Sequence, residues 1–228
     1  MKEGLLERIR AVGHWRVNIR PHPPLPERLT LQRCLEEVER ARVSIRGWDY
    51  PHVSRRQDDH GGAERVGEYF ENWCDWQSQV EFWRMYRSAQ FLSYNALNED
   101  LDGSYHNPPP GSFLDIRDAI YSVTEFCEFA RRLHANGVHE NGSELKISLS
   151  NTEGRQLWVG PGRIPFFDPM RTNASTILIE RLVWPEDWTA GAIDIALSIL
   201  LELFDHFGWN PAASQIKGDQ EKFMRREF

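Results

Sequence analysis

The sequence predicts an α+β fold, in which helices pack on a mainly antiparallel sheet. Apolar residues recur at helical spacing over two long segments, at about 113–135 and 187–207, and over a shorter one at about 31–41. The segments between them are rich in aromatic and β-branched residues that alternate with polar ones, a pattern typical of strands. Blocks of strands separated by single helices favour this class over alternating βαβ units.

The length predicts one domain. A chain of 228 residues buries roughly 70% of its unfolded surface and needs neither disulfides nor metal for stability. We expect a single α+β domain over residues 1–209, with any subdivision in the Pro-rich loop near 102–111. Residues 210–228 are expected to form a polar C-terminal tail, weakly anchored by Ile216 and Phe223.

Charge and composition narrow the function classes. The net charge of −7 and the pI near 5.6 argue against a protein that coats nucleic acid by bulk electrostatics, and they leave binding through a local basic patch open. The three cysteines are far apart and form no CxxC pair, which indicates buried thiols in a reducing compartment. The N-terminus lacks the apolar stretch of a signal peptide, and no apolar run is long enough to span a membrane. We therefore expect a cytoplasmic protein without a membrane partner.

The N-terminal part of the chain contains short elements separated by breaks. Thr30 is a suitable N-cap for the helix that follows it, and the Gly61-Gly62 pair favours a loop before the aromatic tract. In order, we expect a short helix at 2–12, a strand at 15–19, the helix at 31–41, a strand beginning at 43–45 and a polar loop at 51–64.

The aromatic tract over residues 67–98 is ambiguous by periodicity alone. Its density of Phe, Trp and Tyr favours strands over a helix. We expect three strands here, at 67–76, 79–88 and 90–98.

The helix at about 113–135 is the clearest element of the sequence. Ser112 is a suitable N-cap, Asp115 completes a capping box, and Asn136-Gly137 is a stop signal. After it, we expect a strand at 145–149, a hairpin partner at 156–159 and a strand at 176–184.

The last helix is expected to be deeply buried. Pro185 opens it, Gly208 closes it, and apolar residues nearly encircle it between these two positions. A helix with so narrow a polar stripe contacts other elements on more than one side.

The segment Arg46-Gly-Trp-Asp-Tyr-Pro-His contains the candidate catalytic residues. Asp49 and His52, at a strand end, are suited to an acid/base pair, and His60 lies in the same loop region. The alternative interpretation is structural: Trp48 and Tyr50 pack, and Asp49 caps the turn before the proline. The spacing specifies no mechanism, which favours the structural interpretation.

No metal or cofactor is expected. His52 and His60 share a loop with Asp58 and Asp59, but the sequence has no HxH or HExxH motif. Nucleophile elbows, phosphate-binding loops and dinucleotide fingerprints are also missing.

The aromatic residues are candidates for a binding surface, either as stacking platforms for bases or as part of a protein interface. Acidic neighbours such as Glu71 and Glu81 oppose a phosphate backbone, which favours sheet core and protein interface. The candidate binding residues are Trp48, Tyr50, Trp73, Trp76, Trp83, Arg84, Tyr86 and Arg87.

A resemblance covers residues 15–100. The segment 46–52 quoted above, followed by Phe-Trp-Arg-Met-Tyr-Arg-Ser-Ala-Gln-Phe at 82–91, resembles parts of uncharacterised bacterial proteins. Some of these accompany Schlafen-type AlbA-like DNA-binding domains. The resemblance implies a bacterial accessory or regulatory module and transfers no site residue.

Three functions follow as hypotheses. The first is a non-catalytic binding or regulatory module that contacts a protein partner or a second copy of itself as a homodimer. The second is a hydrolase or nuclease with its site at 46–60. The third is a nucleic-acid binder that uses Arg55, Arg56, Arg84 and Arg87.

Overall fold

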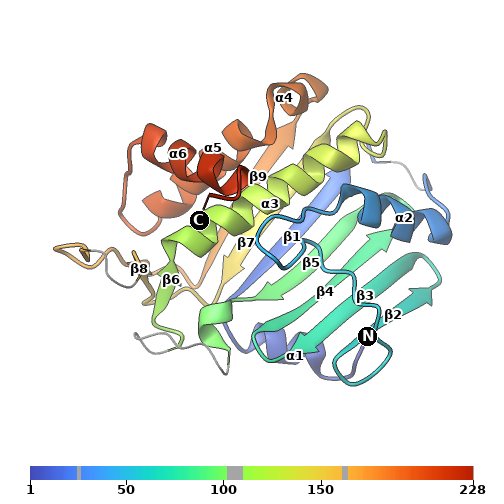
Figure 1. The fold of residues 1–228 in the computed structure, drawn as a ribbon, viewed down its shortest axis with the longest axis horizontal. Coiled ribbons are helices and arrows are strands. Elements are labelled where there is room, and N and C mark those ends of the chain that lie inside the picture. The colour runs from blue at the N-terminus through green and yellow to red at the C-terminus, as the bar shows by residue number, and fades with distance from the viewer. Residues whose placement is uncertain (25–26, 102–109, 161–163, 228) are drawn as a thin grey trace.

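The computed structural model describes residues 1–24, 27–101, 110–160 and 164–227. Within these residues, the main sheet has seven strands in the order β2-β3-β4-β5-β1-β7-β9, and each neighbouring pair is antiparallel (Figure 1). The predicted α+β fold with a mainly antiparallel sheet is therefore confirmed. The strands are β1 (His14–Pro21), β2 (Gly61–Val66), β3 (Tyr69–Trp76), β4 (Gln79–Tyr86), β5 (Phe91–Ala96), β6 (Phe113–Asp115), β7 (Ser143–Ser150), β8 (Gln156–Trp158) and β9 (Thr176–Val183).

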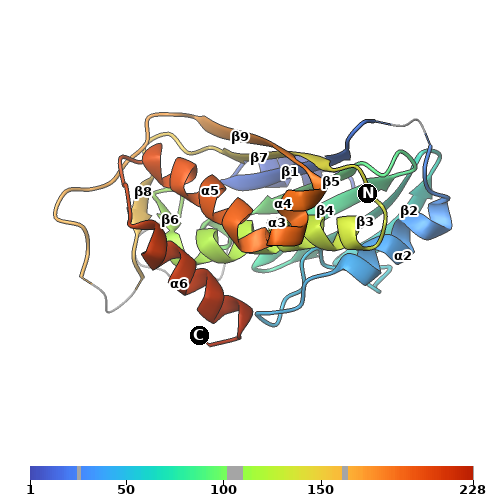
Figure 2. The same cartoon turned by 90° about the horizontal axis from the view of Figure 1, so that it is seen from above.

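The helices lie on both faces of the sheet but unequally. The α-helices are α1 (Leu5–Arg10), α2 (Leu31–Ala41), α3 (Ile116–Ala135), α4 (Pro185–Ala190), α5 (Ala192–Asp205) and α6 (Ala213–Met224). The helices α2 to α5 cover one face, and α6 lies against α3 and α5 on the side away from β9 (Figure 2). The main core lies under α3, whereas Leu5 and Ile9 of α1 pack on the opposite face against Trp73, Phe82 and Tyr94.

The central helix begins one turn later than predicted. The Asp115 carboxylate accepts hydrogen bonds from the backbone N–H groups of Arg117 at 2.8 Å and Asp118 at 3.1 Å, so Asp115 is the N-cap. Ser112 is not the cap, because the residues after it form β6. The strand β6 pairs in parallel with β8. The predicted hairpin between 156–159 and the strand at 145–149 is therefore wrong.

Buried Arg155 explains the position of β8. Its guanidinium forms an ion pair with Asp100, and Nη1 donates to the Phe113 carbonyl oxygen at 2.9 Å. A buried cation needs a paired carboxylate, and these partners draw the segment toward β6 instead of β7.

Two C-terminal expectations need correction. The predicted helix at 187–207 is divided into α4 and α5 by Gly191, whose φ of 129° and ψ of 151° interrupt the helix. The predicted tail at 210–228 contains α6, whose Ile216 and Phe223 are fully buried. A narrow apolar stripe is enough to hold α6 against the core, because a polar contact adds to it. The buried side chain of Gln220 donates to the Thr124 hydroxyl at 3.1 Å.

The polar loop was predicted to extend to residue 64, but β2 begins at Gly61, so the loop is shorter than predicted. Gly61 and Gly62 do not break the strand, and their lack of a side chain allows neighbouring side chains to pack closely against the backbone. A Cβ atom on Gly62 would lie 2.6 Å from the Trp73 ring. The strand predicted at 43–45 is reduced to a single bridge between Val43 and Tyr50.

The other predicted elements are confirmed within small shifts of their ends. They are the helices at 2–12 and 31–41 and the strands at 15–19, 67–76, 79–88, 90–98, 145–149 and 176–184. Most of the suggested subdivision near 102–111 lies outside the described residues.

The fold predicts that α5 contributes strongly to stability. Leu200 is fully buried, so Leu200→Ala should lower the free energy of unfolding by about 2–5 kcal/mol in urea denaturation. Ile164 is 92% exposed and serves as the control, because Ile164→Ala should change stability by less than about 0.5 kcal/mol. Equal effects of the two substitutions would contradict this packing.

Candidate functional site

The segment between α2 and β2 crosses the face of the sheet that α3 leaves open (Figure 1). Polar contacts from the sheet hold this segment in place. The Trp83 indole N–H donates to the His52 carbonyl oxygen at 2.6 Å, and the Tyr50 hydroxyl lies 2.9 Å from the Ser93 hydroxyl. Both contacts are made beneath the segment, so its residues are positioned by the sheet itself.

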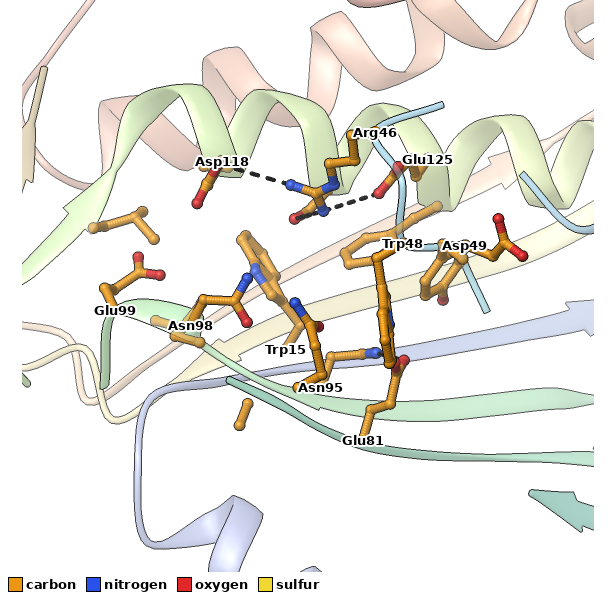
Figure 3. Close-up of a pocket in the computed structure, with 18 residues that line it drawn as sticks. Trp15, Arg46, Trp48, Asp49, Glu81, Asn95, Asn98, Glu99, Asp118 and Glu125 are labelled. Atoms are coloured by element: carbon orange, nitrogen blue, oxygen red, sulfur yellow. Dashed lines mark hydrogen bonds and ion pairs between the residues drawn. The ribbon is translucent and has the colours of Figure 1, made fainter. Parts of the chain in front are cut away.

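A pocket of about 60 Å³ lies between this segment, α3 and the ends of β4 and β5 (Figure 3). We call it the acidic pocket. The acidic residues that line it, together with Arg46, are Asp49 from the crossing segment, Glu81 from β4, Glu99 from the 3₁₀ turn Asn98–Asp100, and Asp118 and Glu125 from α3.

Arg46 spans one side of the acidic pocket. Its Nη2 atom donates to Glu125 Oε2 at 2.9 Å and to the Ser122 hydroxyl at 3.0 Å, and its Nη1 atom lies 3.7 Å from Asp118 (Figure 3). The Arg46 guanidinium therefore forms ion pairs with two carboxylates, those of Glu125 and Asp118. The other carboxyl groups of the pocket form no ion pair with Arg46 among the described residues.

Glu81 is a buried carboxyl group that is held by two short hydrogen bonds. Its Oε1 atom accepts from the Trp48 indole N–H, and its Oε2 atom accepts from Asn95 Nδ2, each at 2.6 Å. Burial, helped by the charge of Glu125, raises the pKa of Glu81 to about 7 despite these donors. Glu81 thus titrates near neutral pH.

The other two buried carboxyl groups behave similarly. Burial raises the pKa of Glu99 to about 8, and the charge of Asp118 adds to the effect. Burial also raises the pKa of Glu125 to about 7, although the charge and hydrogen bond of Arg46 lower it. Several carboxyl groups with pKa values near neutrality around one pocket are typical of functional sites.

Two buried oxygen atoms of the acidic pocket lack a donor. In the described part of the chain, Glu125 Oε1 and Asn95 Oδ1 have no hydrogen-bond partner. Both residues line the pocket, and the Glu125 side chain is only 1% exposed. Buried acceptors are costly when unpaired, so a group that donates hydrogen bonds would be stabilised here.

The predicted catalytic residues are separated by Trp48. Asp49 lies on the acidic-pocket side, where its carboxylate is 3.1 Å from Arg42. His52 stacks on Trp48 with ring centroids 4.0 Å apart, and it lines a different concavity together with His60. Among the described residues, no hydrogen bond joins the Asp49 carboxylate to the His52 ring. The structure therefore gathers these residues in one region without forming the expected acid/base dyad.

Three of the six predicted aromatic binding residues belong to the core. Tyr50, Trp73 and Trp83 are buried, whereas Trp76 at the end of β3 is 41% exposed. Trp48 is half-buried and lines the acidic pocket.

The remaining predicted binding residues have partners on the protein. Arg84 donates to Glu71 at 2.6 Å, and Arg87 donates to Glu27 at 2.8 Å. Tyr86 packs edge-on against Tyr69 with ring centroids 5.3 Å apart. Each of these side chains therefore has a partner within the chain, and their role in binding stays a prediction.

Sequence reasoning missed the acidic residues of the pocket. Glu81 alternates in phase with Trp83 and Met85, which face the main core, so a carboxyl group at this inward position was an available signal. Glu125 precedes Phe126 on a helix with a wide apolar face and carried the same signal. Neither residue reveals from sequence alone that they share a pocket.

In comparisons with known proteins, no family model matches the chain, and no curated protein or solved structure matches it. None of the described helices is long and apolar enough to cross a membrane. Among the described residues, no three His, Cys, Asp or Glu side chains are grouped so that they could hold a metal ion.

The raised pKa of Glu81 predicts a specific pH dependence of stability. Because the pKa rises from 4.5 to about 7 on folding, the contribution of this group is full below about pH 4.5 and is lost as the pH rises through about 7. Glu81→Gln removes this loss. The variant should therefore gain on the order of 3 kcal/mol relative to wild type between about pH 4.5 and pH 8.

Urea denaturation across this pH range measures the effect. Exposed Glu153 provides the matched control, because Glu153→Gln should leave the pH profile of wild type unchanged. Parallel profiles for Glu81→Gln and wild type would show that Glu81 is not the buried, titrating group.

Proposed function

We propose that the protein is a non-catalytic binding module that recognises a protein partner by accepting a lysine side chain in the acidic pocket. The unpaired acceptors Glu125 Oε1 and Asn95 Oδ1 are the observation that carries the proposal. The module would act as a regulatory or accessory component of a bacterial cytoplasmic system, as the sequence resemblance over residues 15–100 implies.

The charge of the pocket supports a cationic ligand. Five carboxyl groups line it, whereas Arg46 is the cation that reaches into it. Asp49 has a further partner in Arg42. Among the described residues no ion pair compensates Glu81, which accepts hydrogen bonds from the neutral groups of Trp48 and Asn95. An added positive charge would favour the ionised forms of these carboxyl groups.

The size of the pocket supports a side-chain terminus. A volume of about 60 Å³ is well below the roughly 150 Å³ that accommodates benzene. An ammonium group is compact and carries three donors, which suits several acceptors in a small space. The half-buried indole of Trp48 beside it offers an apolar surface for the aliphatic stem of a lysine, and Trp is enriched at protein interfaces.

Titration with N-acetyl-lysine amide tests this proposal. We expect weak but saturable binding by calorimetry, with affinity rising from about pH 6 to about pH 8 because the cation favours ionised carboxylates. Glu125→Gln should weaken binding by roughly tenfold or more, since it removes the charge that faces the ammonium group. Glu153→Gln on the surface should have no effect.

The uncharged analogue N-acetyl-norleucine amide separates charge recognition from apolar contact. Binding of both amides with equal affinity would refute the proposal, as would binding of the lysine amide that Glu125→Gln leaves intact. Melting curves of the variant establish that it is folded in each comparison.

A hydrolase or nuclease is the second candidate, because the raised pKa values of Glu81, Glu99 and Glu125 suit a general acid at neutral pH. This version of the enzyme hypothesis places the acid on β4, α3 or the 3₁₀ turn instead of on His52. Glu99→Gln separates the two functions: a binding module would lose affinity alone, whereas an enzyme would lose turnover.

The homodimer remains a prediction, but the observations that support it differ from those in the sequence. The apolar surface of α5 is covered within one chain by α3, α6 and β9, and Trp15, Trp83 and Trp188 are buried in the core. What supports self-association is the edge strand β9, where Leu178 and Leu182 are 51% and 45% exposed.

Light scattering across a dilution series tests the dimer. We expect twice the chain mass of 26.7 kDa at micromolar concentration, and Leu178→Lys should return the mass to that of one chain. A wild-type mass near 26.7 kDa throughout the series would rule the homodimer out.

A further inference from the structure

A second concavity lies on the other side of Trp48 from the acidic pocket. Its volume is about 400 Å³, within the range of small-molecule sites. We call it the aromatic groove. The residues that matter for its chemistry are Trp48, His52, Arg55, Arg56, His60 and Trp76.

Planar rings form two walls of the aromatic groove. Trp48 and His52 stack with an interplanar angle of 19°, and burial lowers the pKa of His52, so its ring is neutral at neutral pH. Trp76 is 41% exposed, and the His60 ring meets it edge-on with centroids 5.0 Å apart. Exposed π faces of this kind are platforms on which flat ligands stack.

The charge of the aromatic groove is opposite to that of the acidic pocket. The residues that line the groove include two arginines and no carboxylate, although the whole chain has a net charge of −7. The Arg56 guanidinium lies 4.8 Å from the centre of the Trp76 ring and forms an ion pair with Asp58 at 2.8 Å. Within the described residues, the exposed guanidinium of Arg55 has no ion-pair partner.

The groove is pre-formed by contacts between the crossing segment and the sheet. The Ser54 backbone N–H donates to Asn72 Oδ1 at 2.9 Å, and Asn72 Nδ2 donates to the Ser54 carbonyl oxygen at 3.0 Å. The approach is close enough that a Cβ atom on Gly61 would lie 2.2 Å from the Ser54 hydroxyl oxygen. A rigid groove loses little conformational freedom when a ligand binds.

From these observations, we infer that the aromatic groove binds a nucleobase that carries a phosphate group. The base stacks on Trp76 or His52, and the phosphate is bound by Arg55 with Arg56 beside it. The combination of exposed π faces and the guanidinium group of Arg55, which has no ion-pair partner among the described residues, recognises a flat, anionic ligand. Burial raises the pKa of Cys74 in this groove to about 12, so the site binds its ligand without a thiolate nucleophile. The observations that support this inference are separate from those that support lysine recognition, although Trp48 lines both concavities.

Calorimetric titration of the full chain with adenosine 5′-monophosphate tests the inference. We expect saturable binding that weakens by roughly 5- to 150-fold in Trp76→Ala, the range for loss of one stacking contact. Arg55→Ala should weaken binding of the monophosphate while leaving the weaker binding of adenosine unchanged. Both side chains are exposed, so these variants should retain the wild-type melting temperature.

The matched control for Trp76 is Trp184, which is 43% exposed and also contacts a histidine edge-on, His22, at 5.3 Å. Trp184→Ala should bind like wild type. A short single-stranded oligo-adenylate then distinguishes the source of the base: tighter, salt-sensitive binding indicates nucleic acid, and equal or weaker binding indicates a free nucleotide. The inference would be overturned if neither adenosine 5′-monophosphate nor the oligo-adenylate bound. It would also be overturned if Trp76→Ala bound the monophosphate as tightly as wild type does, or if wild type bound phenyl phosphate as tightly as the monophosphate.

Discussion

The hydrogen bond between the Trp48 indole and the buried carboxyl group of Glu81 fixes the arrangement of both candidate sites. Glu81 projects from β4 into the main-core face of the sheet, where a carboxyl group requires donors to remain buried. Trp48 supplies one donor, and the indole is thereby held across the end of the sheet. The acidic pocket lies on one side of this ring, and the aromatic groove lies on the other.

This arrangement is possible because the helices do not cover the whole face of the sheet. The helix α3 crosses the central strands, and the chain from 42 to 60 covers the region beyond it (Figure 1). A helix would pack there through a continuous apolar stripe. An irregular segment instead brings polar side chains and backbone groups to the sheet, including the His52 carbonyl oxygen that accepts from Trp83. The polar sites therefore form where irregular chain replaces a helix.

The elements with strong local signals were predictable from the sequence. The Thr30 cap of α2 was identified from residue type, and the apolar spacing of α2 and α3 and the alternation in β1 and β7 reflect burial on one face, which periodicity reports directly. The divided last helix and the parallel pairing of β8 were not predictable. The first depends on the backbone conformation of Gly191, and the second depends on the buried ion pair of Arg155 with Asp100.

The site was predictable in part. The segment 46–60 was identified from its unusual Trp, Asp and His residues, and it does line both concavities. Glu81, Glu99 and Glu125 come from three elements that are far apart in the chain. No spacing rule connects them, because only the packing of α3 over the ends of β4 and β5 brings them together.

The shared position of Trp48 has a thermodynamic consequence. If a ligand on either side changes the orientation of this ring, it alters the Glu81 hydrogen bond on one side and the His52 stacking contact on the other. Two binding events that depend on the same side chain are coupled, and the coupling free energy acts equally in both directions. Protonation of Glu81 would also affect both sites, because a neutral carboxyl group accepts a weaker hydrogen bond from the indole than a carboxylate does. The acidic pocket and the aromatic groove are thus linked through one indole ring and one buried carboxyl group.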